Sequence, residues 1–69
     1  MQSLSERLLS LRNEHKLSRE TLCHAISIGV RTYQRYENGE REPTASTIVA
    51  LADYYKVSTD YLLGRTDQR

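Results

Sequence analysis

The apolar residues of the 69-residue chain recur at steps of three and four from one end to the other. That spacing places them on one face of successive α-helices, because an α-helix completes a turn every 3.6 residues. No stretch alternates with a period of two for long enough to predict a strand. The pattern therefore predicts an all-α protein.

Signals at helix ends divide this pattern into five short helices. Ser3, Ser18 and Ser58 each stand where a serine hydroxyl can cap the start of a helix, while Asn38-Gly39 and Gly64 are stop signals. The positions that the spacing predicts to face inward are Leu4, Leu8, Leu11, Leu22, Cys23, Ile26, Tyr33, Tyr36, Glu37, Ile48, Leu51, Ala52, Tyr55, Leu62 and Leu63.

Two of the predicted helices, over residues 18–26 and 29–38, are joined by a very short turn. Such a pair packs at a steep angle, and the crossing needs a small side chain, for which Cys23 is suited. This is the geometry of the DNA-reading helix-turn-helix, in which the second helix enters the major groove. Residues 18–38 are thus the segment most informative about function.

The solvent side of the second of these helices carries Val30, Arg31, Gln34 and Arg35. In the major groove an arginine can donate two hydrogen bonds to guanine, and a glutamine can pair with adenine. Val30 is suited to contact a thymine methyl group. An ordinary solvated helix face is the alternative for these side chains, but their types are those that base recognition requires.

Four segments are similar to the Cro and phage-repressor (lambda repressor-like, Xre-type) helix-turn-helix family. They are residues 35–39 (RYENG), 41–44 (REPT), 17–22 (LSRETL) and 57–64 (VSTDYLLG), and the resemblance extends from about residue 4 to residue 64. Each segment alone is moderately specific, whereas all of them at matching spacing are highly specific. The resemblance implies a five-helix, lambda repressor-like DNA-binding domain.

The family's functional positions fall on several residues here. By resemblance, Ser18 and Arg19 contact a phosphate, Asn38 and the loop through Arg41 grip the DNA backbone, and Val30, Arg31, Gln34 and Arg35 read bases. Glu37 matches an acid that pairs with an arginine of the first helix, and Arg12 is the candidate for this structural ion pair.

Some positions depart from the family's pattern. Ser27 stands where relatives have a turn glycine, and Gly29 stands where they have a capping serine or threonine; Ser27 as the cap is therefore an open alternative. A glutamine is common at Arg19, so that its phosphate contact is expected to be a longer-range ionic one. Lys56 replaces a usual glycine, at a cost in strain if the backbone there is left-handed.

Composition and charge argue against several other classes of protein. The net charge of +1 suits a protein that reads a particular site better than one that coats DNA. The single cysteine excludes an internal disulfide, and no apolar run approaches the ~20 residues that span a bilayer, so we expect a cytoplasmic protein without membrane contact. Neither His15 nor His24 has a cysteine or carboxylate partner at the spacing of a zinc site. No metal, cofactor, small-molecule ligand or catalytic constellation is expected, and the protein is not predicted to be an enzyme.

The sequence therefore predicts a DNA-binding domain over residues 1–64 and a short C-terminal tail over 65–69. Its predicted partner is double-stranded DNA, bound by a homodimer at a palindromic operator, and its predicted role is that of a transcriptional repressor. Residues 59–63, with Tyr61 outermost, are the expected dimer contact. The alternative is an antitoxin or protein-interaction module that uses the same fold.

Overall fold

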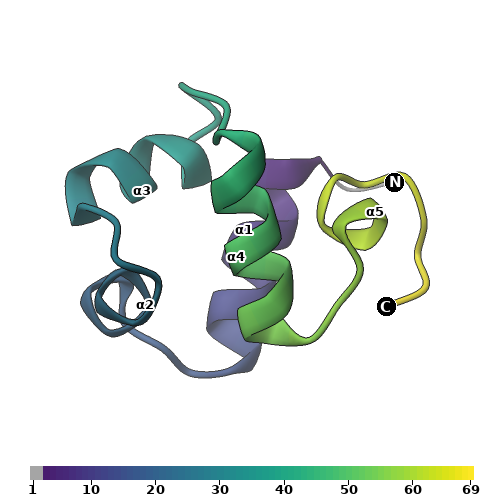
Figure 1. Ribbon diagram of the computed structural model, residues 1–69, viewed down its shortest axis with the longest axis horizontal. Helices are drawn as coiled ribbons and strands as arrows, with labels where there is room; N and C mark the ends of the chain where they lie inside the picture. Colours follow the sequence, from purple (N-terminus) through teal and green to yellow (C-terminus); the bar gives the residue numbers. More distant parts are fainter. Residues whose placement is uncertain (1–2) are drawn as a thin grey trace.

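The computed structural model describes residues 3–69, and all regular secondary structure within them is helical (Figure 1). The helices are α1 (Leu4–Glu14), α2 (Arg19–Ile26), α3 (Val30–Glu37), α4 (Ala45–Tyr55) and α5 (Thr59–Leu62). The prediction of an all-α, five-helix fold is confirmed. Residues 1 and 2, the start of the predicted domain 1–64, lie outside the described residues.

Hydroxyl side chains fix where most of these helices begin. Ser3 and the side chain of Glu6 form a reciprocal capping box at the start of α1. Ser18, Thr44 and Ser58 each accept a hydrogen bond from a backbone amide of the first turn of α2, α4 and α5. These bonds satisfy amides that have no partner within the helix, so the boundaries are set locally by the sequence.

One hydrophobic core joins the helices, and its fully buried side chains come from all of them. The core consists of Leu8, Leu11, Leu22, Cys23, Tyr33, Tyr36, Leu51, Ala52, Tyr55, Tyr61 and Leu62. Leu4, Ile26 and Ile48, predicted to face inward, are partly buried and pack against this core. In Figure 1, α2 and α3 lie at one end of the molecule and α5 at the other, with α1 and α4 between them.

The predictions for two residues near the last helix were wrong. Leu63, expected to pack inward, is 41% exposed, and Tyr61, expected to be outermost, is only 8% exposed. The reason is that α5 ends at Leu62, so that Leu63 is the C-cap and leaves the buried face. Tyr61 is covered by the guanidinium of Arg7, whose Cζ lies 3.9 Å from the centre of the ring.

Residues 65–69, predicted as a short tail, lie along α1 and α5. Asp67 pairs with the buried Arg7 at 2.7 Å, and both Nη atoms of Arg69 lie 2.6 Å from the carboxylate of Glu14. The backbone oxygen of Arg69 also accepts a hydrogen bond from the amide of Ser58. The end of the chain is thereby held at the α5 end of the molecule, away from α3 (Figure 1).

Candidate nucleic-acid interface

Only residues 27–29 separate α2 from α3. Ser27 is the C-cap of α2 and takes a left-handed backbone conformation, with φ 58° and ψ 50°. Gly29 is the N-cap of α3 and offers no side chain to its amides. The alternative in which Ser27 caps α3 is therefore wrong, and α3 begins at Val30. A turn this short fixes the angle between the two helices.

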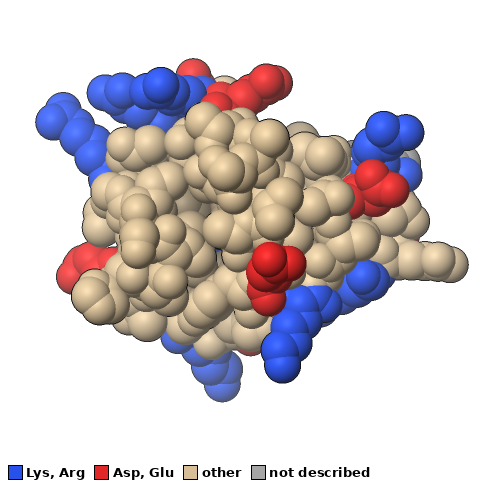
Figure 2. Space-filling view, in the orientation of Figure 1, with Lys and Arg blue, Asp and Glu red and all other residues tan. Residues whose placement is uncertain are grey.

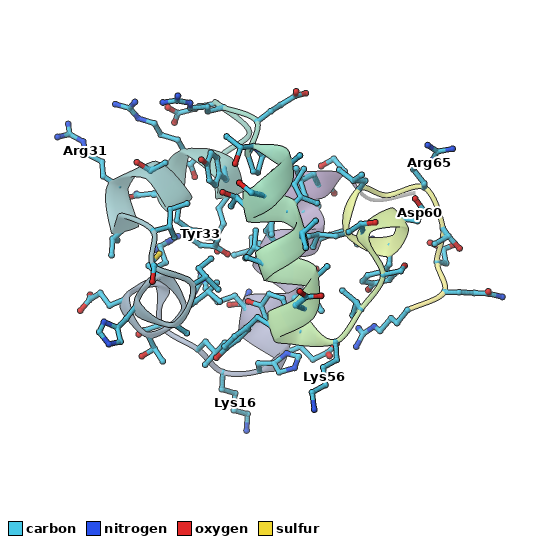
Figure 3. The ribbon with its side chains drawn as sticks, viewed as in Figure 1. Lys16, Arg31, Tyr33, Lys56, Asp60 and Arg65 are labelled. Carbon is cyan, nitrogen blue, oxygen red and sulfur yellow. The ribbon has the colours of Figure 1, made fainter. Side chains whose placement is uncertain are left out.

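The inner face of α3 anchors the helix to the body. Tyr33 is fully buried, Tyr36 is 6% exposed and Glu37 is 8% exposed, as their spacing predicted. Figure 3 shows Tyr33 directed toward the body of the molecule, while Arg31 projects outward from the same helix. Burial raises the pKa of the Tyr33 phenol, which keeps it neutral. This face holds α3 against α1 and α2.

The outer face of α3 is polar, cationic and open to solvent. Arg31, Gln34 and Arg35 are exposed and line one open hollow of about 250 Å³ together with Asn38 and Glu40. Figure 2 shows lysine and arginine atoms gathered over α3, with aspartate or glutamate atoms beside them over the loop that follows. The structure thus brings together on one surface three of the four side chains that the sequence predicted to read bases.

Val30 lies at the start of the same helix and is 37% exposed. Its side chain is an apolar group at the start of an exposed face that is otherwise polar. A Cβ added at the neighbouring Gly29 would come near only Thr32 Oγ1, at 3.8 Å, among residues outside its two chain neighbours.

The predicted backbone-binding residues occupy different surroundings. Ser18 is exposed, accepts from the amide of Thr21 at 3.1 Å, and is thus used as a helix cap. Asn38 donates from Nδ2 to Glu40 Oε1 at 3.2 Å. Arg41 is exposed but lines a neighbouring hollow between the start of α1 and residues 39–42 rather than the hollow over α3.

The carboxylate of Glu37 accepts hydrogen bonds from two arginines. Arg12, the partner expected from the resemblance, places Nε 2.6 Å from Oε2, and Arg19 places Nε 3.1 Å from Oε1. Burial acts to raise the pKa of Glu37, but the hydrogen bond from Arg12 and the charges of both arginines outweigh it, and the net pKa is lowered. The carboxylate is therefore charged at neutral pH and links α1, α2 and α3.

Sequence reasoning missed three of these interactions. Arg19 was expected to serve only a phosphate, and its spacing from Glu37 across two helices gives no local signal. Glu40 was not among the predicted site residues, yet it lines the hollow over α3. Arg7 is 3% exposed although arginines are rarely buried, and only the position of residues 61–67 explains it.

Residues 3–69 contain neither a cluster of candidate metal ligands nor a helix suited to span a membrane. No group of three or more histidine, cysteine, aspartate or glutamate side chains is placed to hold a metal ion. No helix in that range combines the length and apolar character needed to cross a membrane.

These features define a helix-turn-helix domain of the phage-repressor type: a short turn, a second helix anchored by tyrosines, and a cationic outer face on that helix. A family model described as helix-turn-helix matches residues 8–62 of the chain. The chain belongs to this helix-turn-helix family.

Relatives carry the same segment within longer chains. The uncharacterized HTH-type transcriptional regulator YobD of Bacillus subtilis is 44% identical over 62 residues, which are 90% of this chain and 55% of that protein. The cryptic phage CTXphi transcriptional repressor RstR of Vibrio cholerae is 34% identical over 62 residues, again 90% of this chain and 55% of the repressor. The chain spans about half the length of the curated relatives it matches.

Solved structures show the same fold. A transcriptional regulator from Listeria innocua superimposes with a TM-score of 0.87 at 28% identity, covering 97% of this chain and 63% of the other. The P22 c2 repressor, crystallised with a synthetic operator, also gives a TM-score of 0.87, at 26% identity, covering 96% of this chain and 100% of the repressor chain. The predicted lambda repressor-like architecture is confirmed.

Proposed function

We propose that this chain is the sequence-specific DNA-binding part of a transcriptional regulator, with residues 1–64 as the DNA-binding domain. The observation that carries the proposal is the division of α3 into two faces. Tyr33 is fully buried, while Arg31, Gln34 and Arg35 share one solvent-exposed hollow. A helix held in this way can enter the major groove of duplex DNA without losing its contacts with the body.

The chemistry of the exposed face determines what it reads. Arg31 and Arg35 each offer a fork of donors that fits guanine O6 and N7, and Gln34 matches the donor and acceptor of adenine. Val30 is placed for contact with a thymine methyl group at the start of the helix. Arg31 and Arg35 are one helical turn apart, so they address neighbouring base pairs rather than the same one.

Phosphate contacts on either side of this face would set the register on DNA. Ser18 and Arg19 stand at the start of α2, and Asn38 and Arg41 follow α3 along the chain. The resemblance to repressor domains and the polar, exposed setting of Ser18, Asn38 and Arg41 support this assignment. Such contacts supply affinity that does not depend on sequence and falls as salt rises.

We further propose that the regulator is a repressor that binds a near-palindromic operator as a homodimer in the cytoplasm. One protein similar to this chain is a phage transcriptional repressor, and another was crystallised with an operator. Two copies of α3 would enter the major groove about 34 Å apart, one helical turn of DNA. Tyr61 is buried and is withdrawn from the dimer contact, whereas Leu63 is exposed and is available for it.

Selection from a random duplex library tests the proposal. The chain is expected to enrich one motif with guanines at the positions read by Arg31 and Arg35, and its affinity is expected to fall with rising salt at a logarithmic slope of about −0.9 per phosphate contacted. Failure to enrich any sequence, together with binding that does not respond to salt, would favour a protein-interaction module instead.

A further inference from the structure

Glu37 lies where three helices meet, in a charge cluster in which positive groups outnumber negative ones. Its side chain is 2% exposed, and it lies against the guanidinium groups of Arg12 on α1 and Arg19 on α2. One buried negative charge therefore faces two positive charges. The cluster carries an excess of one positive charge, which has no counter-ion among these three residues.

The two arginines differ in how fully they are used. Arg12 donates from Nε and Nη2 to Glu37 and from Nη1 to the backbone oxygen of Leu17, and its side chain is 12% exposed. Arg19 donates only from Nε, to Glu37 Oε1, and its side chain is 38% exposed. Among the residues that the structure describes, no acceptor is bonded to either Nη of Arg19. The excess charge thus lies at the solvent end of Arg19.

We propose that Arg19 is a positioning residue that bridges a DNA phosphate and Glu37. This inference rests on the proposed function and adds a mechanism to it. Nε holds the buried carboxylate at the end of α3, while the free Nη groups bind the phosphate, so that charges alternate from phosphate to Arg19 to Glu37 to Arg12. Binding of the DNA backbone at α2 then stabilises the orientation in which α3 reads bases.

The planar fork of arginine is what makes this bridge possible. A guanidinium can donate in two directions from fixed atoms, whereas a lysine ammonium is a point charge that keeps electrostatic attraction without the fork. Arg19→Lys therefore separates charge from geometry. Arg19→Gln removes the charge while keeping a side chain that can hydrogen-bond.

The discriminating quantity is the ratio of affinities for the selected site and for random DNA. A residue that only contacts phosphate affects both affinities alike, because phosphates carry no sequence information. A residue that also holds α3 in place affects the selected site more. Arg19→Lys is expected to lower the ratio of selected-site affinity to random-duplex affinity about tenfold, the loss of one charge-assisted hydrogen bond.

The controls use an arginine at the other end of the molecule. Figure 3 shows Arg65 projecting from the α5 side, far from Arg31, and Arg65→Lys and Arg65→Gln are expected to bind both DNAs as the parent chain does. Arg19→Gln is expected to weaken both DNAs and to lower the salt slope by about one. Urea unfolding of each variant, measured at several temperatures, identifies a temperature at which every variant is folded in the binding assay.

The binding results distinguish a failure of this inference from a failure of the proposed function. If Arg19→Lys matches the parent chain on both DNAs, or loses the same factor on both, then Arg19 does not position α3 and the inference is overturned. If the parent chain itself selects no sequence, the proposed function fails before this question arises. A second readout needs no variant: the Nε–H proton of Arg19 should stay protected from exchange in free and DNA-bound protein, and rapid exchange in both would overturn the bridge as well.

Discussion

Replacing Glu37 by glutamine tests how α3 is held against the body of the molecule. Glu37→Gln preserves the shape of the side chain but removes the negative charge that Arg12 and Arg19 share. Breaking a buried ion pair by removing one partner typically costs ~3–5 kcal/mol, whereas an exposed pair contributes ~1 kcal/mol or less. Arg12 is largely buried, so its pair with Glu37 counts as a buried ion pair. Arg19 is partly exposed, so its pair with Glu37 is closer in strength to an exposed one.

The expected loss follows from these two contributions. Glutamine can still accept one hydrogen bond, so we expect the free energy of unfolding to fall by about 3 kcal/mol, the low end of the buried-pair range. A domain of 69 residues has a total stability of roughly 3–10 kcal/mol, so the substitution should remove between about a third and nearly all of it. Urea unfolding followed by circular dichroism measures the difference, with the exposed Glu42→Gln as the matched control, expected within about 0.5 kcal/mol of the parent.

Acid provides a second signature of the same group. The pKa of Glu37 is lowered in the folded chain, so its stabilisation is present at neutral pH and is lost as the pH falls from the ordinary glutamate pKa through the folded value. The difference in stability between the parent chain and Glu37→Gln should therefore shrink below about pH 4.3. A loss under about 0.5 kcal/mol at neutral pH, or a difference that persists unchanged in acid, would show that the Glu37 charge does not stabilise the fold.

Three further outcomes are expected from residues away from this cluster. Tyr55→Phe should leave the free energy of unfolding unchanged or raise it by up to about 1 kcal/mol, because the buried Tyr55 hydroxyl has no partner in residues 3–69; a loss above that size in urea would show that the hydroxyl is bonded. Lys56→Gly should raise stability by about 0.5–1 kcal/mol, since Lys56 has φ 57°, while Lys56→Ala should give no such gain. Arg7→Met removes the stack on Tyr61 and the ion pair with the exposed Asp67, but it also removes two buried guanidinium nitrogens that have no partner in residues 3–69, so we expect the free energy of unfolding to change by less than about 1 kcal/mol. A larger loss in urea would show that the chain end depends on this guanidinium.

The sequence predicted most of the fold because the relevant signals are local. Hydroxyl caps such as Ser3 and Ser18 mark helix starts, and the three- and four-residue spacing of leucines and tyrosines marks the buried faces. The opposition of Tyr33 to Arg31 also follows from helical geometry alone. These features depend only on residues within a few positions of each other.

What the sequence did not predict depends on distant contacts. The burial of Tyr61 requires Arg7, which is far away in the chain, and the exposure of Leu63 follows from α5 ending one residue before it. Arg19 lies 18 positions before Glu37, so that no periodicity connects them. The left-handed turn at Ser27 was left open because two capping schemes fit the same residues.

We propose that the arginines of α3 contact guanine edges in the major groove. The most direct measurement replaces each guanine of the selected site in turn by 7-deazaguanine, which lacks the N7 acceptor, and compares the parent chain with Arg35→Ala. We expect one position in each half-site where the parent chain loses about tenfold in affinity and Arg35→Ala loses nothing further. If every guanine can be replaced with equal effect on both proteins, Arg35 does not contact a guanine N7 and the account of base recognition is wrong.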